Sequence, residues 1–452
     1  MGKITLSQAA AWCGGRVDPK FENIEFLGAN MDSRNIQPGQ LFIALEGVRD
    51  GHDFIPMAME KGAAAVLCKH SPEDVPSIIV DDPRIALGQI AHGERNRIGM
   101  KVVGVTGSVG KSTTKEMIAC VLEGSFKVAK TPANHNNDIG MPMAILAMEE
   151  DTEVAVLEMG MNHFREIAYL TKIAQPDAAV IINIGTMHIE HLGSREGILK
   201  AKLEIAEGMD EDAHLFLNGD DELLRTAKDQ TAHPVVYFGA PGEDTAVSVS
   251  EIRQTSECLS FRVTAGWNDF AVELPLEGMH YVADALAAIS VGLHMEVSIS
   301  DIQQRLASFR NLAGRQETFE AKGYTIIKDC YNAGPESMAA ALRVLGRKSG
   351  RRIAVLGDML ELGVRTQAEH YRVGRIAAEN ADILLAYGPN ADRVVSGALT
   401  GGMAVEKALE FTDRDELTAT LRRMAKEGDV ILFKGSHGMH MELALEKFLQ
   451  NR

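Results

Sequence analysis

The sequence predicts an α/β protein of three domains: a small mixed α/β domain, a central parallel-sheet domain with a small antiparallel insertion, and a Rossmann-like doubly wound domain. Three observations support this prediction. The chain has 452 residues, of which 45% are apolar, enough for about three domains with ample core. Apolar strand-like runs alternate with helical segments in two stretches, which is typical of parallel sheets covered by helices. Between these stretches lies a segment of two-residue periodicity.

The first domain is expected over residues 1–98, where short strands alternate with turns. Residues 41–45 have strand chemistry and are followed by glycine and aspartate breakers. The run "PSIIVDDP" is a second short strand, closed by Asp-Pro.

The central domain is expected over residues 99–311. Strands are predicted at "KVVGVTG", "EVAVLEMG", "DAAVIINIG" and "AHLFLNGD", which are apolar and end in polar or glycine residues. Helices are predicted over residues 112–123 and in "HFREIAYLTKI" and "SREGILKAKLEIAEGM", where apolar residues recur at helical spacing. From residue 235 to 275 the period becomes two, which predicts the antiparallel insertion.

The third domain is expected over residues 312–452. Its predicted strands are "YTIIKDCYN", "RRIAVLGDM", "ADILLAYG" and "GDVILFKGS", separated by helices such as "TQAEHYRVGRIAAENA". Ligands bind at the carboxyl ends of strands in such sheets. We therefore expect a site near "KDCYN", "LGDM" and "FKGS".

Charge, cysteines and hydropathy exclude several protein classes. The net charge of -17 argues against a nucleic-acid partner. The five cysteines are far apart in the sequence and lack metal-site spacing, so reduced thiols in a cytoplasm are expected. No signal peptide and no membrane-spanning run are found in the sequence. A cytoplasmic monomer without membrane insertion is therefore expected.

The stretch "VTGSVGKSTTKEM", residues 105–117, resembles a phosphate-binding loop. The full pattern is G-x-x-x-x-G-K-[ST], and Val105 stands where its first glycine would be. A strand, a glycine turn and a helix start together aim backbone N–H groups at a phosphate. Lys111 can reach the outer phosphates and Ser112 can ligate Mg²⁺. The alternative, a glycine turn with a solvated lysine, is less consistent with the flanking strand and helix.

For several other polar residues, the sequence pattern alone does not decide between a functional and a structural role. Glu158 follows a strand and is either a magnesium ligand or an exposed acid, while His188 and Lys202 suit an ordinary loop histidine and a solvated lysine. The loop "TPANHNNDIGMP" is either turn-rich or suited to sugar hydroxyls and amides. Its candidate contacts are Asn134, Asn136 and Asn137.

Together these motifs resemble a known family. "VTGSVGKSTTKEM", "NHNNDIGMP", "VLEMGMN", "NIGTMHIEHLGSREGILKAKLEI", "DCYNAGPESM", "VLGDMLELG" and "FKGSHGM" occur in the order and spacing of the Mur ligases of bacterial cell-wall synthesis. The segment "MDSRNIQPGQLFIALEGVRDGHDFI" is similar to a UDP-binding domain of this family. "YNAGPESM" with "LGDMLELG" favours the branch that joins D-alanyl-D-alanine to UDP-N-acetylmuramoyl-tripeptide.

The resemblance implies an ADP-forming amide ligase that uses ATP and two Mg²⁺ ions. ATP would phosphorylate the peptide carboxylate, and the incoming amine would attack the acyl phosphate. The implied catalytic residues are Lys111, Glu158, His188, Lys202 and Arg315. The implied phosphate cradle is Gly107, Ser108, Gly110, Lys111, Ser112 and Thr113. The first Mg²⁺ would be held by Ser112, Thr131 and Glu158. The second would be held by Glu158, His188 and a carbamate on Lys202.

The resemblance also implies substrate contacts. Arg315 would reach the γ-phosphate, and the third domain would close over the nucleotide through Asp329, Tyr331 and Asn332. The incoming amine would lie near Lys434 and Ser436. The UDP-sugar would be contacted by Asp32, Ser33 and Arg34.

The chain departs from the family pattern at several positions. Tyr281 and Asp284 stand where asparagines usually hold adenine, so Tyr281 would stack on the base and Asp284 would accept from its exocyclic amine. His437 replaces a usual arginine. Two alternatives remain: a sister ligase that adds one amino acid, like MurE, and a non-catalytic P-loop nucleotide switch. A switch has no need of Glu158, His188 and Lys202 together.

Overall fold

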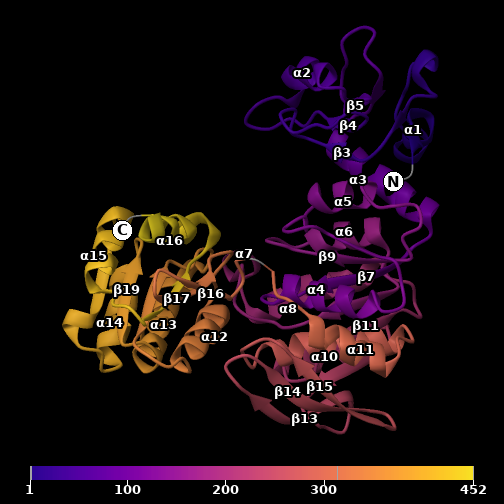
Figure 1. Ribbon diagram of the computed structural model, residues 1–452. Helices are drawn as coiled ribbons and strands as arrows, with labels where there is room; N and C mark the ends of the chain where they lie inside the picture. Colours follow the sequence, from indigo (N-terminus) through magenta and orange to yellow (C-terminus); the bar gives the residue numbers. More distant parts are fainter. Residues whose placement is uncertain (1–2, 313, 451–452) are drawn as a thin grey trace.

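The computed structural model describes residues 3–312 and 314–450. Figure 1 shows three α/β bodies along the chain, with the first domain next to the central one and the third at the side. The predicted three-domain α/β class is confirmed.

The first domain is built on a small parallel sheet. Its strand order is β3-β4-β5-β6, with bounds β3 (Ala29–Asn30), β4 (Leu41–Ile43), β5 (Ala65–Cys68) and β6 (Ser77–Ile79). A two-stranded antiparallel pair lies beside it, made of β1 (Ile4–Thr5) and β2 (Glu25–Phe26). The helices are α1 (Leu6–Cys13), α2 (Ile55–Glu60) and α3 (Pro83–Ile98). Both strands predicted in this domain are present.

The central domain contains a nine-stranded sheet with the order β15-β14-β13-β12-β11-β10-β7-β9-β8. Its strands are β7 (Lys101–Thr106), β8 (Val128–Lys130), β9 (Val154–Glu158), β10 (Ala178–Ile181), β11 (His214–Asn218), β12 (Val235–Gly239), β13 (Thr245–Gln254), β14 (Leu259–Ala265) and β15 (Asn268–Leu274). The helices are α4 (Lys111–Leu122), α5 (Gly140–Leu146), α6 (Glu166–Ala174), α7 (Ile189–Leu192), α8 (Arg195–Leu203), α9 (Glu222–Arg225), α10 (Tyr281–His294) and α11 (Ile299–Ser308).

The antiparallel segment is present but continues the central sheet. β12, which lies inside the predicted antiparallel segment, is parallel to both β11 and β13. Only β13, β14 and β15 pair antiparallel. The segment therefore extends the edge of the parallel sheet.

Two helical layers bury the faces of the central sheet. Successive residues of β7 face opposite cores: Val102 belongs to one cluster, and Val103 to the other. This two-sided burial explains the continuous apolar character of the parallel strands. The first cluster also includes Ile4 and Leu41 of the first domain, and α3 packs against α1, α5 and α6. The first and central domains therefore share one continuous core.

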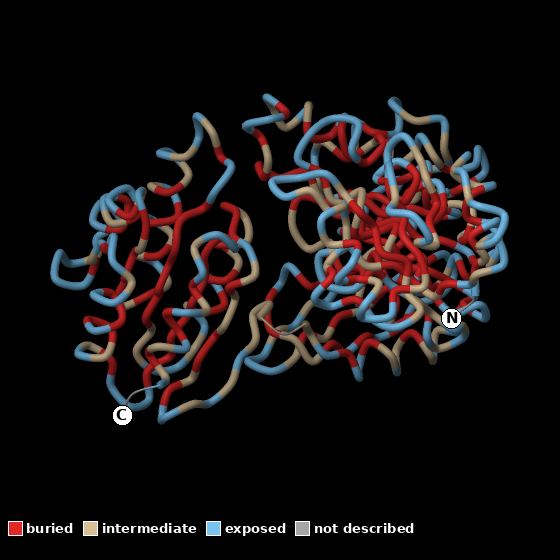
Figure 2. The backbone as a smooth tube through the Cα atoms, turned by 90° about the horizontal axis from the view of Figure 1, so that it is seen from above, coloured by how far each residue is buried: buried red, intermediate tan, exposed pale blue. Residues whose placement is uncertain are grey.

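The third domain has a six-stranded sheet with the order β16-β17-β21-β18-β19-β20. Its strands are β16 (Glu317–Ala321), β17 (Tyr324–Asp329), β18 (Arg352–Gly357), β19 (Ile383–Tyr387), β20 (Ala408–Phe411) and β21 (Val430–Lys434). Its helices are α12 (Pro335–Gly346), α13 (Thr366–Asn380), α14 (Ala391–Thr400), α15 (Arg414–Met424) and α16 (Met441–Gln450). All strand pairs except β16–β17 are parallel, and each face has its own buried cluster. Figure 2 shows this buried interior separate from that of the central domain.

Within residues 3–312 and 314–450, no helix is both long and apolar enough to cross a bilayer.

Candidate functional site

A cavity of about 960 Å³ lies between the central and third domains. The central domain lines it with the loop after β7, the ends of β9 and β10, and the start of α10. The third domain lines it with the ends of β17 and β21 and the first turns of α12. Carboxyl ends of strands from two sheets therefore face the same space, as expected for α/β ligand sites.

The predicted phosphate loop has the expected strand–turn–helix geometry. β7 ends at Thr106 and α4 begins at Lys111. Gly110 has φ +86°, and an added Cβ would lie 3.0 Å from Asp284 Oδ1. A Cβ on Gly107 would lie 2.2 Å from Ile182 Cγ2. Both positions therefore require glycine, and the free N–H groups at the start of α4 suit an anion.

Lys111 lies across this loop. Its Nζ donates to Gly107 O at 2.8 Å and to Ser108 O at 3.3 Å. Burial lowers the pKa of Lys111, the Glu158 carboxylate raises it, and Arg315 lowers it further. The ammonium is thus held at the cavity wall, next to other charged groups that point to the same space.

Glu158 is the carboxylate at the centre of the site, and it is only 2% exposed. Its Oε2 accepts from Ser112 Oγ at 2.6 Å, and its Oε1 accepts from Asn136 Nδ2 at 2.8 Å. Its backbone N–H donates to Thr131 Oγ1 at 3.0 Å. The three residues predicted for the first magnesium ion therefore lie together, and their oxygen donors suit that ion.

Arg315 connects the third domain to the phosphate loop. Its Nη2 donates to Ser112 Oγ at 2.8 Å, and its guanidinium lies 4.0 Å from the centre of the Tyr331 ring. Its predicted reach toward the outer phosphate stays a prediction. The contact also links two segments that are 203 residues apart.

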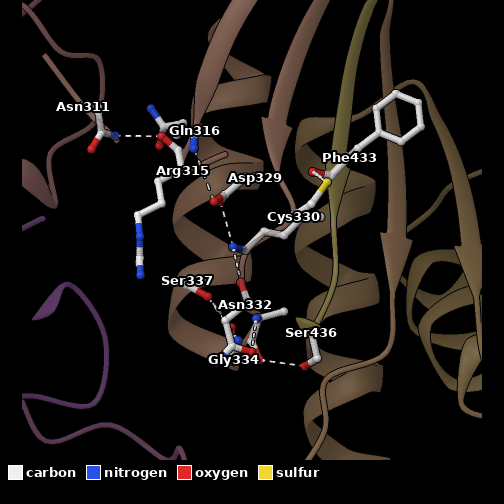
Figure 3. Close-up of polar contacts among 12 residues, drawn as sticks. Asn311, Arg315, Gln316, Asp329, Cys330, Asn332, Gly334, Ser337, Phe433 and Ser436 are labelled. Atoms are coloured by element: carbon white, nitrogen blue, oxygen red, sulfur yellow. Dashed lines mark hydrogen bonds and ion pairs between the residues drawn. The ribbon is translucent and has the colours of Figure 1, made fainter. Parts of the chain in front are cut away.

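The strand ends of the third domain are tied together by Lys434, which is 2% exposed. Its Nζ donates to Asp329 Oδ2 at 2.7 Å and to Asn332 O at 2.9 Å. Figure 3 shows Asp329, Asn332 and Ser436 at this edge of the sheet. Ser436 Oγ is buried as well and donates to Ala333 O at 3.2 Å. The assignment of Lys434 and Ser436 to the amine substrate stays a prediction.

His188 and Lys202 lie in different surroundings. His188 lines the cavity in a left-handed conformation (φ 61°), and its Nδ1 lies 2.6 Å from Glu361 Oε2 of the third domain. That contact lowers the pKa of Glu361. Lys202 is 2% exposed, so it is not a solvated helix lysine. Burial and, second, the positive charge of Lys111 hold the pKa of Lys202 well below its usual value.

The two departures near the adenine position are buried at the start of α10. Tyr281 is 4% exposed, and its hydroxyl accepts from Asn311 Nδ2 at 2.7 Å. Asp284 Oδ1 accepts from Thr114 Oγ1 at 2.7 Å. Burial raises the pKa of Asp284 to about 7, against the Thr114 hydrogen bond and the charge of Arg315. Both side chains line the cavity, and their contacts with adenine stay a prediction.

The three predicted asparagines of the loop at residues 131–139 also line the cavity. Asn136 contacts Glu158, whereas Asn137 Oδ1 accepts from Gly140 N at 2.7 Å and fixes the start of α5. Asn134 is exposed. Asn137 therefore holds the backbone at the start of α5, and the other two face ligand space or the central carboxylate.

The predicted UDP-sugar contacts lie elsewhere, after β3 in the first domain. Arg34 pairs with Asp32 through Nε at 2.9 Å and Nη2 at 2.8 Å. Hydrogen bonds from Arg34 lower the pKa of Asp32 to about 2. Ser33 is buried against Met57. None of these three residues lines the interdomain cavity, so any role they have is at a separate subsite.

Sequence analysis missed one residue that holds the phosphate loop. Asn183 follows β10, and its Oδ1 accepts from the backbone N–H groups of Ser108 and Val109, each at 3.0 Å. Its Nδ2 donates to Val109 O at 2.9 Å. β10 is the hydrogen-bonded neighbour of β7, so a polar residue at its carboxyl end was the available signal.

The residues present fit ATP and one Mg²⁺. The helix start, the two obligatory glycines and Lys111 suit phosphate, and the oxygen donors around Glu158 suit a hard cation. Within the part of the chain that the structure describes, no three His, Cys, Asp or Glu side chains are grouped to hold a metal.

Three family models match the chain in order. The model described as "Mur ligase family, catalytic domain" matches residues 23–95, "Mur ligase middle domain" matches residues 105–292, and "Mur ligase, glutamate ligase domain" matches residues 314–437.

Relatives resemble the chain over its full length. A Bacillus subtilis (strain 168) protein named UDP-N-acetylmuramoyl-tripeptide--D-alanyl-D-alanine ligase is 38% identical, covering 100% of this chain and 99% of the relative. The crystal structure of MurF from Acinetobacter baumannii is 31% identical, covers 100% of both chains and has a TM-score of 0.90. MurF ligase from Thermotoga maritima in complex with ADP is 31% identical, covers 94% of this chain and 97% of its own, and has a TM-score of 0.82.

Proposed function

The chain belongs to the Mur ligase family, and we propose that it joins D-alanyl-D-alanine to UDP-N-acetylmuramoyl-tripeptide with ATP, releasing ADP and phosphate. The observation that carries this proposal is the single cavity lined by both the phosphate loop and the strand ends of the third domain. Such a cavity lets one site hold a nucleotide, a carboxylate and an amine together. Positioning of reactants in this way removes much of the entropic barrier to the reaction.

The first step activates the carboxylate of the tripeptide. A carboxylate oxygen attacks the γ-phosphorus of ATP, the bond to the β-phosphate oxygen breaks, and an acyl phosphate and ADP result. Two anions must approach, so cationic groups must reduce their repulsion. Lys111 and Arg315 supply fixed positive charge from the central and third domains. Mg²⁺, when held by Ser112, Thr131 and Glu158, would screen the same charge.

The second step forms the amide. The neutral amine of D-alanyl-D-alanine attacks the acyl carbon, and the tetrahedral intermediate loses a proton from its nitrogen and expels phosphate. The dipeptide would enter from the third domain, beside "FKGSHGM" and "NAGPESM". Asp329 and Asn332, held by Lys434, shape that side of the cavity.

Lys202 is proposed to carry a carbamate. Its lowered pKa favours the neutral amine, which adds CO₂ by forming an N–C bond and losing a proton. The product is an anion with two oxygens, suited to a hard cation in a way that an amine is not. With Glu158 and His188 it would complete the ligands of a second Mg²⁺.

The division of labour among domains is part of the proposal. Residues 1–98 would bind the UDP-sugar-peptide, residues 99–311 would bind ATP, and residues 312–452 would close on ATP and bind the amine. The element boundaries support these limits, because helix α3 ends at Ile98 and strand β16 begins at Glu317. A cytoplasmic location fits an enzyme that consumes ATP.

Phosphate release with each substrate alone and in combination tests the proposed function. Release is expected only when ATP, the UDP-tripeptide and D-alanyl-D-alanine are all present. Free D-alanine, L-lysine and diaminopimelate should support little turnover. A preference for one of these single amino acids would instead assign the chain to the branch that adds one residue, and ATP binding without any ligation would favour the nucleotide switch.

A further inference from the structure

A fully buried lysine lies one helical turn beyond the phosphate loop. Lys115 is on α4, four residues after Lys111, and its side chain is 0% exposed. No step of the proposed reaction uses it. Lysine is almost never fully buried without a partner, because the ammonium loses its hydration. The groups that contact the Lys115 ammonium therefore indicate the role of its charge.

Lys115 joins α4 to the loop that carries the asparagines. Its Nζ donates to Thr131 O at 2.6 Å and lies 3.2 Å from Glu116 Oε1. The short distance to Thr131 is typical of a charge-assisted hydrogen bond. Glu116 also pairs with Lys130, which is partly exposed. Two lysines thus contact Glu116, but of these two, within the described residues, only Lys115 donates a hydrogen bond to Thr131.

Thr131 passes this restraint on to the central carboxylate. Thr131 is 0% exposed, and its Oγ1 accepts from the backbone N–H of Glu158 at 3.0 Å. Its own N–H donates to Val156 O at 3.2 Å. A shift of the Thr131 backbone would therefore move the Thr131 hydroxyl and, with it, the end of β9. Glu158, which contacts Ser112 of the phosphate loop, lies at that end of β9.

We propose that Lys115 is a positioning residue, whose ammonium fixes Thr131 and, through Thr131, the Glu158 carboxylate for the ATP- and magnesium-dependent step. This inference rests on the proposed function. An apolar side chain of the same length would leave the buried Thr131 carbonyl without its donor. A lysine has both the length to cross from α4 to this carbonyl and the charge to hold it tightly.

The test compares Lys115→Met with Lys130→Met in the full-length protein. Lys115→Met keeps an unbranched, buried side chain of nearly the same length but removes the donor and charge. Its kcat is expected to fall about 10- to 100-fold, and its affinity for Mn²⁺ in the presence of an ATP analogue, measured by titration calorimetry, should fall by a similar factor. The KM for the UDP-tripeptide should stay unchanged. Lys130 pairs with the same glutamate, Glu116. Lys130→Met should therefore match the wild type in kcat, Mn²⁺ affinity and KM.

A double-mutant cycle separates the relay from a general loss of packing. If Lys115 acts through Thr131, then Lys115→Met and Thr131→Val should each weaken Mn²⁺ binding, and the double variant should be little worse than the poorer single one. Additive effects, or wild-type kcat and Mn²⁺ affinity in folded Lys115→Met, would overturn the inference. If Lys115→Met fails to fold, Lys115→Gln, which keeps an N–H donor without the charge, is measured in its place by the same criteria. A wild-type protein without ligase activity would instead count against the proposed function.

Discussion

Lys111 offers the most direct test of the nucleotide site at the scale of a single residue. Lys111→Ala removes a charge at the cavity wall and little core volume, so the fold should persist. Loss of one such electrostatic group lowers catalysis on the order of 10²–10³-fold. We expect that loss in acyl-phosphate formation, measured by trapping the intermediate with hydroxylamine. Lys200→Ala, at an exposed position on α8, is the matched control. Near-normal turnover in folded Lys111→Ala would refute the role.

Lys202 tests the carbamate. Lys202→Ala and Lys202→Arg are both expected to be nearly inactive, because neither can form the anion with two oxygens. Short carboxylic acids should partly restore Lys202→Ala by filling the vacated space, but they should not help Lys111→Ala. Activity is measured by phosphate release, with Lys200→Ala again as the control. Full activity of Lys202→Arg would contradict the modification, since an arginine cannot add CO₂ in this way.

Asp284 predicts a pH dependence of stability. Its pKa is raised to about 7 from 3.8 by burial, so the folded state keeps a proton that the unfolded state releases. Stability should therefore fall as pH rises through this range, by roughly 4 kcal/mol at most. Asp284→Asn should remove this dependence. The free energy of unfolding of Asp284→Asn minus that of the wild type, measured with denaturant, should be larger at about pH 8 than at about pH 5. An equal difference at both pH values would show that Asp284 does not titrate in this way.

Local chemistry explains which site residues the sequence could indicate. Lys111 and Ser112 stand in a contiguous loop whose strand and helix are both visible in the pattern. Lys202 could not be distinguished from Lys200 by pattern alone, because only the tertiary packing buries one and exposes the other. Asn183 was missed for a related reason: its partners are 74 and 75 residues away in the sequence.

At the scale of elements, the parallel strands were predictable and their order was not. β7, β9, β10 and β11 are apolar on both faces because helices cover both, and this produces continuous apolar runs. The segment of two-residue period was expected to be antiparallel throughout, but β12 at its start is an apolar run that pairs parallel to β11. Sheet order depends on long-range pairing that a single strand does not encode.

The turn after β10 should control the phosphate loop. Asn183→Ala removes the side-chain acceptor of two backbone N–H groups. The Ser108 N–H keeps the Asn183 carbonyl at 3.2 Å, and the Val109 N–H loses the acceptor it has in the structure. Such a loss costs about 1–3 kcal/mol, so the dissociation constant for an ATP analogue should rise roughly 10-fold. Equilibrium titration with a fluorescent analogue measures it. Thr186→Val, in the same turn, loses a contact with Glu336 instead and should bind nucleotide normally. Unchanged affinity in Asn183→Ala would exclude the clamp.

At the scale of the molecule, polar contacts between distant segments join the third domain to the central one. Arg315 contacts Ser112, Thr186 donates to Glu336 at 3.1 Å, and His188 pairs with Glu361. These pairs connect positions that lie 150 residues or more apart in the sequence. The sequence pattern therefore predicted three domains, but it could not predict how the domains are arranged. The first domain differs, because its core is continuous with the central domain.

This difference predicts which domain moves. The third domain contributes Arg315, Asp329 and Asn332 to a cavity whose phosphate loop belongs to the central domain, so both must meet around the nucleotide. The link near Leu312 should act as the hinge, and closure should exclude water from the acyl phosphate. We expect the radius of gyration in solution scattering to fall when an ATP analogue and the UDP-tripeptide are both bound. Arg315→Ala, which lacks the bridge to the phosphate loop, should compact less at the same saturation. An unchanged radius in the saturated wild type would show that the domains already stand in their reactive arrangement.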